Sequence, residues 1–243
     1  MTALLKKLDW DSEFFGMPIA RVISEAPGDA ELRQINEECE KSRYACLYAL
    51  VDGERSTAVH ALESHAFQLM DIRMTLTRKV SVDQLVNPAG DVVVRPSGET
   101  DIHSLRAIAR VSHVDSRYYA DSNFSRSRCD DLYALWIEKS CRDYADMVLV
   151  AELSGKPVGY ITCDANDDHV GQIGLFAVDA SAQGRGIGRR LIQESLVWFH
   201  AQGCDRVDVV TQGCNVRAQQ VYQKADFVTS RVQLWFHKWM RNK

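Results

Sequence analysis

Residues 171–192 read GQIGLFAVDASAQGRGIGRRLI. This pattern predicts a strand, a short turn with three glycines at every second position, and then a helix. Glycines at 184, 186 and 188 permit positive φ angles and a close approach of the backbone to a ligand. The first-turn amides of the following helix lack intrahelical partners and lie at the positive end of its dipole. With Arg185, Arg189 and Arg190 beside them, these amides are typical of a site for a polyanion, most simply a pyrophosphate.

Two common phosphate-binding loops do not fit. A Walker loop needs Lys-Ser/Thr after its last glycine, whereas Gly188 is followed by two arginines. A Rossmann loop has the spacing G-x-G-x-x-G and opens the first strand–helix unit, whereas this G-x-G-x-G segment lies late in the chain. Residues Gln183–Gly188 instead match Q/R-x-x-G-x-G/A, and this region resembles the coenzyme A loop of the GNAT acetyltransferases. The alternative is a tight turn without a ligand, which would need neither the third glycine nor the arginines.

Composition and charge narrow the class of protein. With 46% apolar and 26% charged residues, the chain of 243 residues is typical of a soluble globular protein. A net charge of −4 gives no basic excess, so nucleic acid is not an expected partner. No apolar run approaches the ~20 residues of a membrane span, and the N-terminal residues lack the apolar core of a signal peptide. We therefore expect a cytoplasmic protein without a membrane span.

Cysteine and histidine usage gives no sign of a metal site. The seven cysteines are an odd number without any Cys-x-x-Cys pair, and the seven histidines are dispersed. This pattern favours free thiols in a reducing compartment over disulfides or zinc. We expect no metal.

The chain divides best at the breaker cluster Asn87–Gly90, which separates a small N-terminal α/β domain (1–88) from a larger domain (91–243). In the first range we expect strands at 20–23, 45–51 and 73–78 and a helix at 57–66. In the second we expect the order β-α-α-β-β-β-α-β-α-β. Its segments are 92–95, 101–113, 130–141, 147–152, 157–163, 169–179, 187–202, 206–211, 215–225 and 227–239, with a loop at 116–126.

This order is that of the GNAT acyl-CoA N-acyltransferase fold, a mixed, mostly antiparallel sheet flanked by helices. The resemblance therefore covers roughly residues 91–239. It implies that backbone groups of a bulged strand hold the pantetheine arm and the acetyl carbonyl, at Phe176, Ala177 and Val178. It also implies that Asn215, a good N-cap residue in any case, bonds the pantetheine arm. The loop residues that would bind the coenzyme are Gln183, Gly184, Arg185, Gly186, Ile187, Gly188 and Arg189.

Tyr222 follows Asn215 by seven residues, which places both on one face of a helix. In many GNAT enzymes a tyrosine here, in a pattern like Tyr-x-Lys-x-Gly-Phe, protonates the departing thiolate. This chain has Asp226 where the family has glycine, and aspartate can still adopt the left-handed conformation at some cost. A tyrosine with pKa ~10 is protonated at neutral pH and can supply that proton. The alternative is a core tyrosine with no chemical role.

The general base is not identified by the sequence. Its candidates, each also a plausible loop residue, are Asp164, Asp167, Asp168, His169 and His113. In several relatives an ordered water relays the proton instead.

Further segments resemble the TDP-fucosamine acetyltransferases within this family, which acetylate the 4-amino group of a TDP-linked deoxysugar for surface polysaccharide. They are Leu8–Gly16, Ser116–Phe124, Leu132–Glu138 and Thr211–Asn215. Arg117 can pair with a diphosphate, and Tyr118 and Tyr119 can stack on a sugar or base. An ordinary surface loop is the alternative for these three residues.

The sequence thus predicts an acetyl-CoA-dependent N-acetyltransferase whose acceptor is a small-molecule amine, most simply on a nucleotide-linked amino sugar. The alternatives are a peptide or another small amine as acceptor, and a non-catalytic acyl-CoA-binding sensor. The retention of Tyr222 and Asn215 beside the loop disfavours a sensor. The sequence allows a homodimer and does not determine the oligomeric state.

Overall fold

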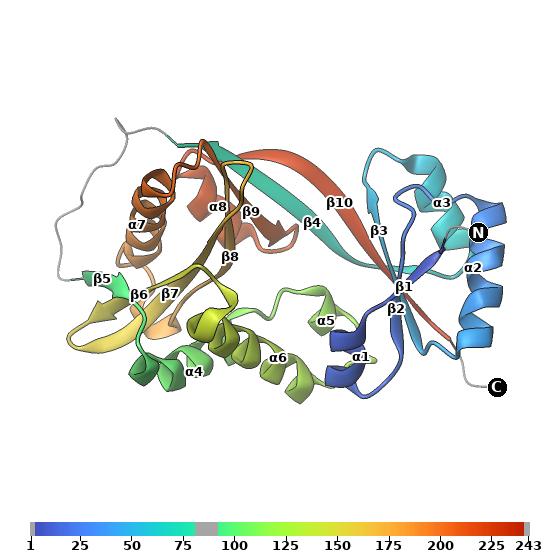
Figure 1. Ribbon diagram of the computed structural model, residues 1–243, viewed down its shortest axis with the longest axis horizontal. Helices are drawn as coiled ribbons and strands as arrows, with labels where there is room; N and C mark the ends of the chain where they lie inside the picture. The colour runs from blue at the N-terminus through green and yellow to red at the C-terminus, as the bar shows by residue number, and fades with distance from the viewer. Residues whose placement is uncertain (1–2, 81–91, 241–243) are drawn as a thin grey trace.

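A computed structural model describes residues 3–80 and 92–240. The predicted boundary at Asn87–Gly90 lies outside the described residues. Two lobes are joined by the long strands β4 (Gln68–Lys79) and β10 (Val228–Trp239), which run side by side from one lobe into the other (Figure 1).

The N-terminal half confirms the predicted strands and helix and adds elements that were not predicted. The predicted segments correspond to β2 (Ile19–Val22), β3 (Cys46–Asp52), α3 (Ser56–Ser64) and β4, and the added elements are β1 (Leu5–Lys7), α1 (Asp9–Phe15) and α2 (Asp29–Ser42). Helix α2 buries Leu32, Ile35 and Cys39, which share one face at helical spacing. They pack in one core with the side chains of β3 and α3.

The second half follows the predicted order of elements. They are β5 (Val92–Pro96), the 3-10 turn η2 (Glu99–Asp101), α4 (Ile102–Ser112), α5 (Arg117–Ala120), α6 (Arg126–Lys139), the π-turn η3 (Ser140–Tyr144), β6 (Met147–Leu153), β7 (Lys156–Ala165), β8 (Val170–Val178), η4 (Ala180–Ala182), α7 (Ile187–Ala201), β9 (Arg206–Gln212) and α8 (Val216–Gln223). The loop predicted at 116–126 was wrong in part, since it contains the single turn α5.

All these strands form one sheet in the order β1-β2-β3-β10-β4-β9-β8-β7-β6-β5. The pairs β2–β3 and β8–β9 are parallel and the other pairs are antiparallel. The C-terminal strand β10 lies between β3 and β4, so the two predicted domains share a continuous sheet. Their division stays a prediction.

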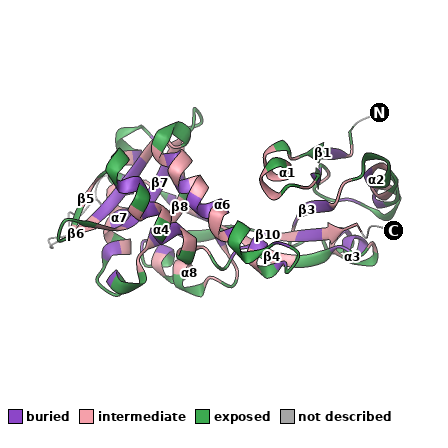
Figure 2. Cartoon of the chain, turned by 90° about the horizontal axis from the view of Figure 1, so that it is seen from below, coloured by how far each residue is buried: buried purple, intermediate pink, exposed green. Residues whose placement is uncertain are grey.

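Helices cover both faces of the second half of the sheet. Because strand side chains alternate, Leu149 and Ala151 pack with α7, whereas Val148 and Val150 pack with α4 and α6. Figure 2 shows buried residues along the strands between these helices.

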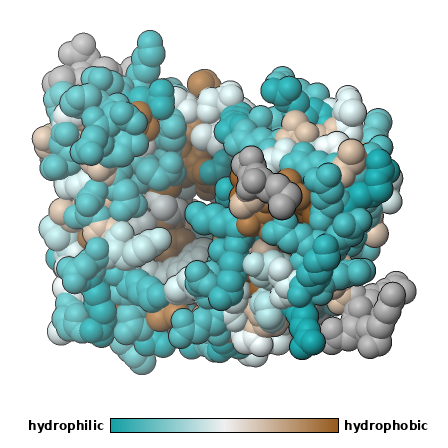
Figure 3. Space-filling model, turned by 45° about the vertical axis from the view of Figure 1, so that its right-hand side comes forward, coloured by the Kyte–Doolittle hydropathy of each residue, from teal (hydrophilic) through white to brown (hydrophobic). Residues whose placement is uncertain are grey.

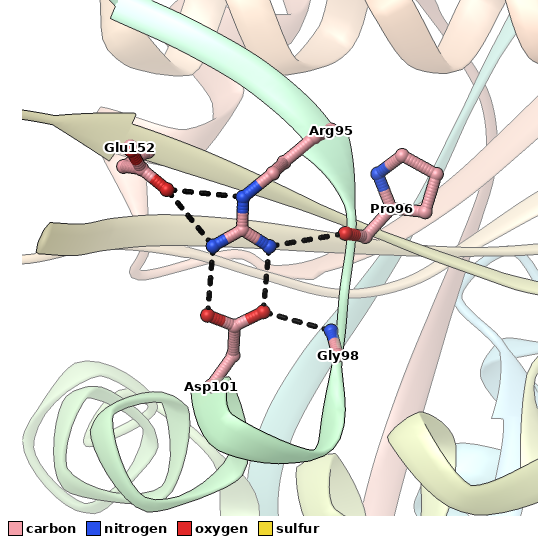
Figure 4. A network of polar contacts seen from close by, with 5 residues as sticks. All are labelled: Arg95, Pro96, Gly98, Asp101 and Glu152. Atoms are coloured by element: carbon pink, nitrogen blue, oxygen red, sulfur yellow. Dashed lines mark hydrogen bonds and ion pairs between the residues drawn. The ribbon is translucent and has the colours of Figure 1, made fainter. Parts of the chain in front are cut away.

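An ion network fixes the start of α4 against the edge of the sheet (Figure 4). Arg95 Nη1 and Nη2 donate to Asp101 Oδ2 and Oδ1 at 2.7 and 2.9 Å, and Arg95 Nε donates to Glu152 Oε2 at 3.0 Å. The amide of Gly98 also donates to Asp101, which is 3% exposed. Such bidentate Arg–carboxylate pairs are stronger than neutral hydrogen bonds and fix the relative orientation of the two side chains.

Replacing Asp101 with asparagine should lower the free energy of unfolding by roughly 1–3 kcal/mol, because a buried charge-assisted contact is lost. Hydrogen bonding by Arg95 lowers the pKa of Asp101 below its ordinary value of 3.8. Its contribution is therefore present above that value and lost as pH falls through the lower folded pKa. Urea unfolding of both proteins at neutral and acidic pH measures this difference.

Asp131→Asn is the matched control. Asp131 pairs with Arg110 at 2.6 Å, but both side chains are 42% exposed. This change should cost less than about 1 kcal/mol. Equal losses for the two variants would contradict the role given to the Arg95 network.

Candidate functional site

The sheet opens where β8 and β9 part. Their parallel ladder ends at the pair Ile173–Val209. The residues that follow on each strand line a cavity of about 250 Å³ (Gly174, Leu175 and Phe176 on β8; Val210, Thr211 and Gln212 on β9). The space-filling view shows a hollow near the centre of the face it presents, with hydrophobic surface at its base (Figure 3).

A bulge in β8 lies at this opening. The register shifts between the pairs Ile161–Phe176 and Cys163–Ile173, and the amide of Leu175 donates to Thr162 Oγ1 at 2.8 Å. A Cβ at Gly174 would lie 2.6 Å from that oxygen, so a larger residue there would displace the Thr162 hydroxyl from this contact. The bulge expected at Phe176–Val178 therefore lies just before those residues, which pair regularly with β7.

The glycine loop joins β8 to α7 in the conformation that its sequence predicts. Gly184 and Gly186 have φ angles of 79° and 76°, which other residues adopt at a cost, and the space where a Cβ would stand is open at both. Gly186 directly precedes α7, and no side chain caps this helix. A Cβ at Gly188 would lie 3.1 Å from the ring of Phe176, which lines the cavity. The helix N-terminus is thus accessible beside the cavity wall, as binding of an anion requires.

Gln183 is held at the start of this loop. Its Nε2 donates to the carbonyl of Val178 at 3.0 Å, and Arg217 of α8 donates to its Oε1. These contacts connect the loop to both β8 and α8.

The three arginines at the loop differ in their surroundings. Arg185 and Arg189 are exposed, whereas Arg190 is partly buried and pairs with Glu194 one turn later at 2.8 Å. The positive charge beside the loop is therefore greatest at Arg185 and Arg189.

Helix α8 presents Asn215, Ala218 and Tyr222 to the cavity. Asn215 Oδ1 accepts from the amide of Ala218 at 3.0 Å, which confirms the predicted N-cap. Asp226 has φ 60°, so it adopts the left-handed conformation expected where the family has glycine.

Tyr222 is a buried residue at the cavity wall. It is 3% exposed, and its ring lies 5.7 Å from those of Phe176 and Phe227. Burial raises the pKa of Tyr222 above its ordinary value of 10, so the hydroxyl is protonated at neutral pH. A protonated donor at this position can serve as a general acid.

Arg117 extends from α5 into an aromatic box at the cavity. Its Cζ lies 4.2, 4.3 and 5.1 Å from the ring centroids of Trp235, Tyr118 and Tyr48, and Nη2 donates to the Tyr118 hydroxyl at 2.7 Å. Its buried Nε has no hydrogen-bond partner. Within residues 3–80 and 92–240, no carboxylate lies within ion-pair distance of Arg117. The guanidinium is therefore available to an anion.

Buried contacts of the loop after α5 hold that helix in place. Asp121 Oδ2 accepts from Trp239 Nε1 at 2.7 Å and is bonded to His237 Nδ1 at 2.7 Å, and Asp121 Oδ1 accepts from Asn123. Burial raises the pKa of Asp121, but these hydrogen bonds outweigh it and lower the pKa to about 2. A charged Asp121 thus fixes the end of α5, and with it Arg117, to β10.

Strand β4 adds two residues that sequence reasoning missed, Asp71 and Arg73. Because they are two positions apart, they lie on the same face of the strand, and both line the cavity. Arg73 Nη1 donates to Gln233 Oε1 of β10 at 2.7 Å. Nothing in the local sequence distinguishes these residues from other polar positions of an alternating strand.

Other predicted residues lie apart from the cavity or are unsuited to the role. Tyr119 does not line it, and its hydroxyl donates to Asp130 at 2.6 Å. Of the base candidates, His113 lines the cavity, but burial lowers its pKa to about 4. The remaining candidates do not line it: Asp164, Asp167, Asp168 and His169.

The described residues were also compared with the requirements of a metal site and of a membrane-spanning helix. In residues 3–80 and 92–240, no group of three or more His, Cys, Asp or Glu side chains is arranged to hold a metal ion. No helix in the same ranges combines the length and apolar character needed to cross a bilayer. All seven cysteines are free thiols.

Comparisons with known proteins agree with this geometry. The family model described as Acetyltransferase (GNAT) family matches residues 109–227. An acetyltransferase of Sodalis glossinidius is 31% identical over 106 residues, which are 41% of this chain and 73% of that protein. The dTDP-fucosamine acetyltransferase of Escherichia coli O6:H1 is 27% identical over 240 residues, 97% of this chain and 98% of that protein.

The fold has solved counterparts as well. A GCN5-related N-acetyltransferase from Sphaerobacter thermophilus superimposes with a TM-score of 0.70 at 17% identity, over 98% of this chain and 76% of that one. The glycine loop, the parting strands and these relatives lead to one conclusion. The chain belongs to the GNAT acetyltransferase family and is an acetyl-CoA-dependent N-acetyltransferase.

Proposed function

We propose that this enzyme acetylates the amino group of a nucleotide-linked amino sugar, most simply the 4-amino group of a TDP-linked deoxysugar used for surface polysaccharide. The observation that carries the proposal is the Arg117 guanidinium, which lacks a carboxylate partner among the described residues and lines the same cavity as Tyr222. A relative that matches nearly the whole chain has the name dTDP-fucosamine acetyltransferase, which supports this choice of acceptor.

The coenzyme would bind across the opening between β8 and β9. We assign its pyrophosphate to the amides of the loop from Gln183 to Arg189, because the helix N-terminus and exposed arginines favour an anion there. Backbone groups of Phe176, Ala177 and Val178 would hold the pantetheine arm and the thioester oxygen, with Asn215 as a further partner of that arm. Donors fixed in this way stabilise the negative charge that develops on the carbonyl oxygen.

Tyr222 is the proposed general acid. The amine attacks the thioester carbonyl, and the thiolate that leaves takes a proton from the Tyr222 hydroxyl. A coenzyme A thiol resembles cysteine, with a pKa of ~8.5, so its thiolate is basic enough to be protonated.

The cavity fits a sugar better than a whole nucleotide. Its volume of about 250 Å³ lies just below the roughly 300–1,000 Å³ of pockets that enclose drug-sized ligands. The sugar would therefore occupy the cavity, and the diphosphate would lie beside Arg117. Arginine binds phosphate through two parallel hydrogen bonds, and Arg117 has its unpaired Nε available for one of them.

Arg117→Met should raise KM for a nucleotide-linked amino sugar by roughly 10- to 100-fold, because hydrogen bonds to charged groups contribute about 1.5–3 kcal/mol. Methionine keeps an unbranched side chain within the aromatic box. KM for the same amino sugar without its nucleotide should stay near the wild-type value. Steady-state kinetics with both acceptors, together with a melting curve, measure this.

Arg126→Met provides the control, since Arg126 Cζ lies 5.5 Å from the ring of Tyr119, outside the cavity. It should leave both KM values unchanged. If Arg117→Met instead weakens both acceptors equally, or neither, Arg117 does not recognise the diphosphate.

A further inference from the structure

The proposed reaction needs a proton acceptor in the cavity. An aliphatic amine, with a pKa near 10, enters as an ammonium ion at neutral pH and must lose a proton before its nitrogen can attack. Among the described residues that line the cavity, Asp71 is the one carboxylate.

The strand geometry directs Asp71 into the cavity. On β10, Trp235 pairs with Asp71 and the next residue pairs with Leu69, so β4 has an extra residue at Met70. Such bulges re-aim side chains and are frequent beside active sites. Asp71 lies opposite Trp235, whose ring also contacts Arg117, so the carboxylate shares a wall with the proposed phosphate site.

The charged groups around Asp71 leave it unpaired but close to positive charge. None of the described basic side chains lies within ion-pair distance of it. Burial is the largest influence on the pKa of Asp71 and raises it to about 7. Arg117, which faces Asp71 from α5, lowers this pKa, whereas Asp115 raises it. The other titratable groups that line the same cavity are Arg73, His113, Tyr118, Tyr133 and Tyr222.

We propose, on the basis of the function proposed above, that the Asp71 carboxylate accepts the proton of the bound acceptor ammonium. The catalytic site is thereby completed by a residue of the N-terminal half. Of the described cavity residues, His113 is the other side chain that could act as a base, and its pKa of about 4 makes it a weak one.

Protons and electrons balance over the proposed reaction. The ammonium transfers one proton to Asp71, and the nitrogen lone pair forms the C–N bond at the carbonyl carbon. When the C–S bond breaks, sulfur leaves with the electron pair and takes the Tyr222 proton. The nitrogen loses its second proton, which restores Tyr222, and Asp71 releases its proton to solvent. The products are an amide, a thiol and one proton.

Asp71→Asn should lower kcat/KM by about 10²–10⁴-fold, the usual contribution of a general base. In the wild type, kcat/KM should fall as pH drops below about 7, because Asp71 then becomes protonated. Asp71→Asn should not show this decrease in kcat/KM at acidic pH. Its kcat/KM should instead increase as pH rises toward the pKa of the amine. Acetyl-CoA affinity by calorimetry and the melting temperature should change little.

An acceptor analogue whose amino group has a pKa below the assay pH gives the sharpest test. Such an amine arrives uncharged, so the loss caused by Asp71→Asn should shrink to a few-fold. If Asp71 only supported the fold or bound the ammonium ion, the uncharged amine would not restore kcat in Asp71→Asn, and the pH dependence of kcat/KM would not change at the same time. Asp71→Glu, which keeps the carboxylate, should retain more activity than Asp71→Asn.

Asp115→Asn is the matched control, because Asp115 is a nearby carboxylate that does not line the cavity. It should keep near-normal kcat/KM. If Asp71→Asn keeps the wild-type kcat/KM and the same decrease in kcat/KM below about pH 7, the inference is overturned. The assay uses whichever primary amine the wild type acetylates, so failure with nucleotide sugars alone would contradict the proposed acceptor and leave Asp71 testable.

Discussion

Replacing Gly186 with aspartate should reduce acetyl-CoA affinity by roughly 100-fold or more while the fold survives. Gly186 has φ 76° and stands immediately before the first turn of α7. The added carboxylate would lie where the pyrophosphate is expected, repelling it and competing for the same amides. Loss of two charge-assisted hydrogen bonds, at about 1.5–3 kcal/mol each, accounts for this magnitude. Calorimetric titration with acetyl-CoA measures it.

Gly155→Asp separates backbone strain from loss of the ligand site. Gly155 also has φ 76° and open space around its Cα, but it lies in the turn between β6 and β7. Both variants should lose roughly 1 kcal/mol of stability to the left-handed conformation. Only Gly186→Asp should lose coenzyme affinity. Normal acetyl-CoA binding by Gly186→Asp would contradict the assignment of this loop.

Tyr222→Phe should lower kcat by about 10²–10⁴-fold with little change in coenzyme affinity. Phenylalanine keeps the ring that contacts Phe176 and Phe227 and removes only the hydroxyl. Because burial raises the tyrosine pKa, the wild-type rate should not fall through Tyr222 ionisation below pH 10. Single-turnover kinetics under saturating substrates measure the chemical step.

The leaving group provides an internal check on Tyr222. An acyl donor with a more acidic thiol needs less protonation, so the loss should be smaller with that donor. Tyr119→Phe is the matched control, since the Tyr119 hydroxyl bonds Asp130 outside the cavity. A near-normal kcat in Tyr222→Phe would show that this tyrosine only packs in the core.

Local signals made the second half of the fold predictable. The strand–glycine–helix segment at 171–192 depends on short-range backbone preferences, and the structure has β8, the loop and α7 in that order. Tyr222 and Asn215 were placed on one helix face from spacing alone, and both line the cavity. Helix α2 was not predicted, although Leu32, Ile35 and Cys39 have helical spacing, because polar residues dominate its sequence.

The acceptor side of the site could not be predicted in full, because it depends on distant pairing. Asp71 and Arg73 reach the cavity only because β4 pairs with β9 and β10, which are far along the chain. Register across such a sheet, and the extra residue at Met70, are not written in the local sequence of β4. Arg117 was identified from its residue type, but its aromatic box needed Tyr48 of β3 and Trp235 of β10.

Product analysis of acetyl transfer to nucleotide-linked amino sugars tests the central claim most directly. The purified enzyme is incubated with acetyl-CoA and TDP- or UDP-linked amino sugars, and free thiol and product mass are measured together. We expect thiol release that depends on a TDP-linked amino sugar, matched mole for mole by a product that has gained one N-acetyl group. Thiol release without an acetylated sugar, or turnover confined to peptides or amines that lack a nucleotide, would contradict the proposed function.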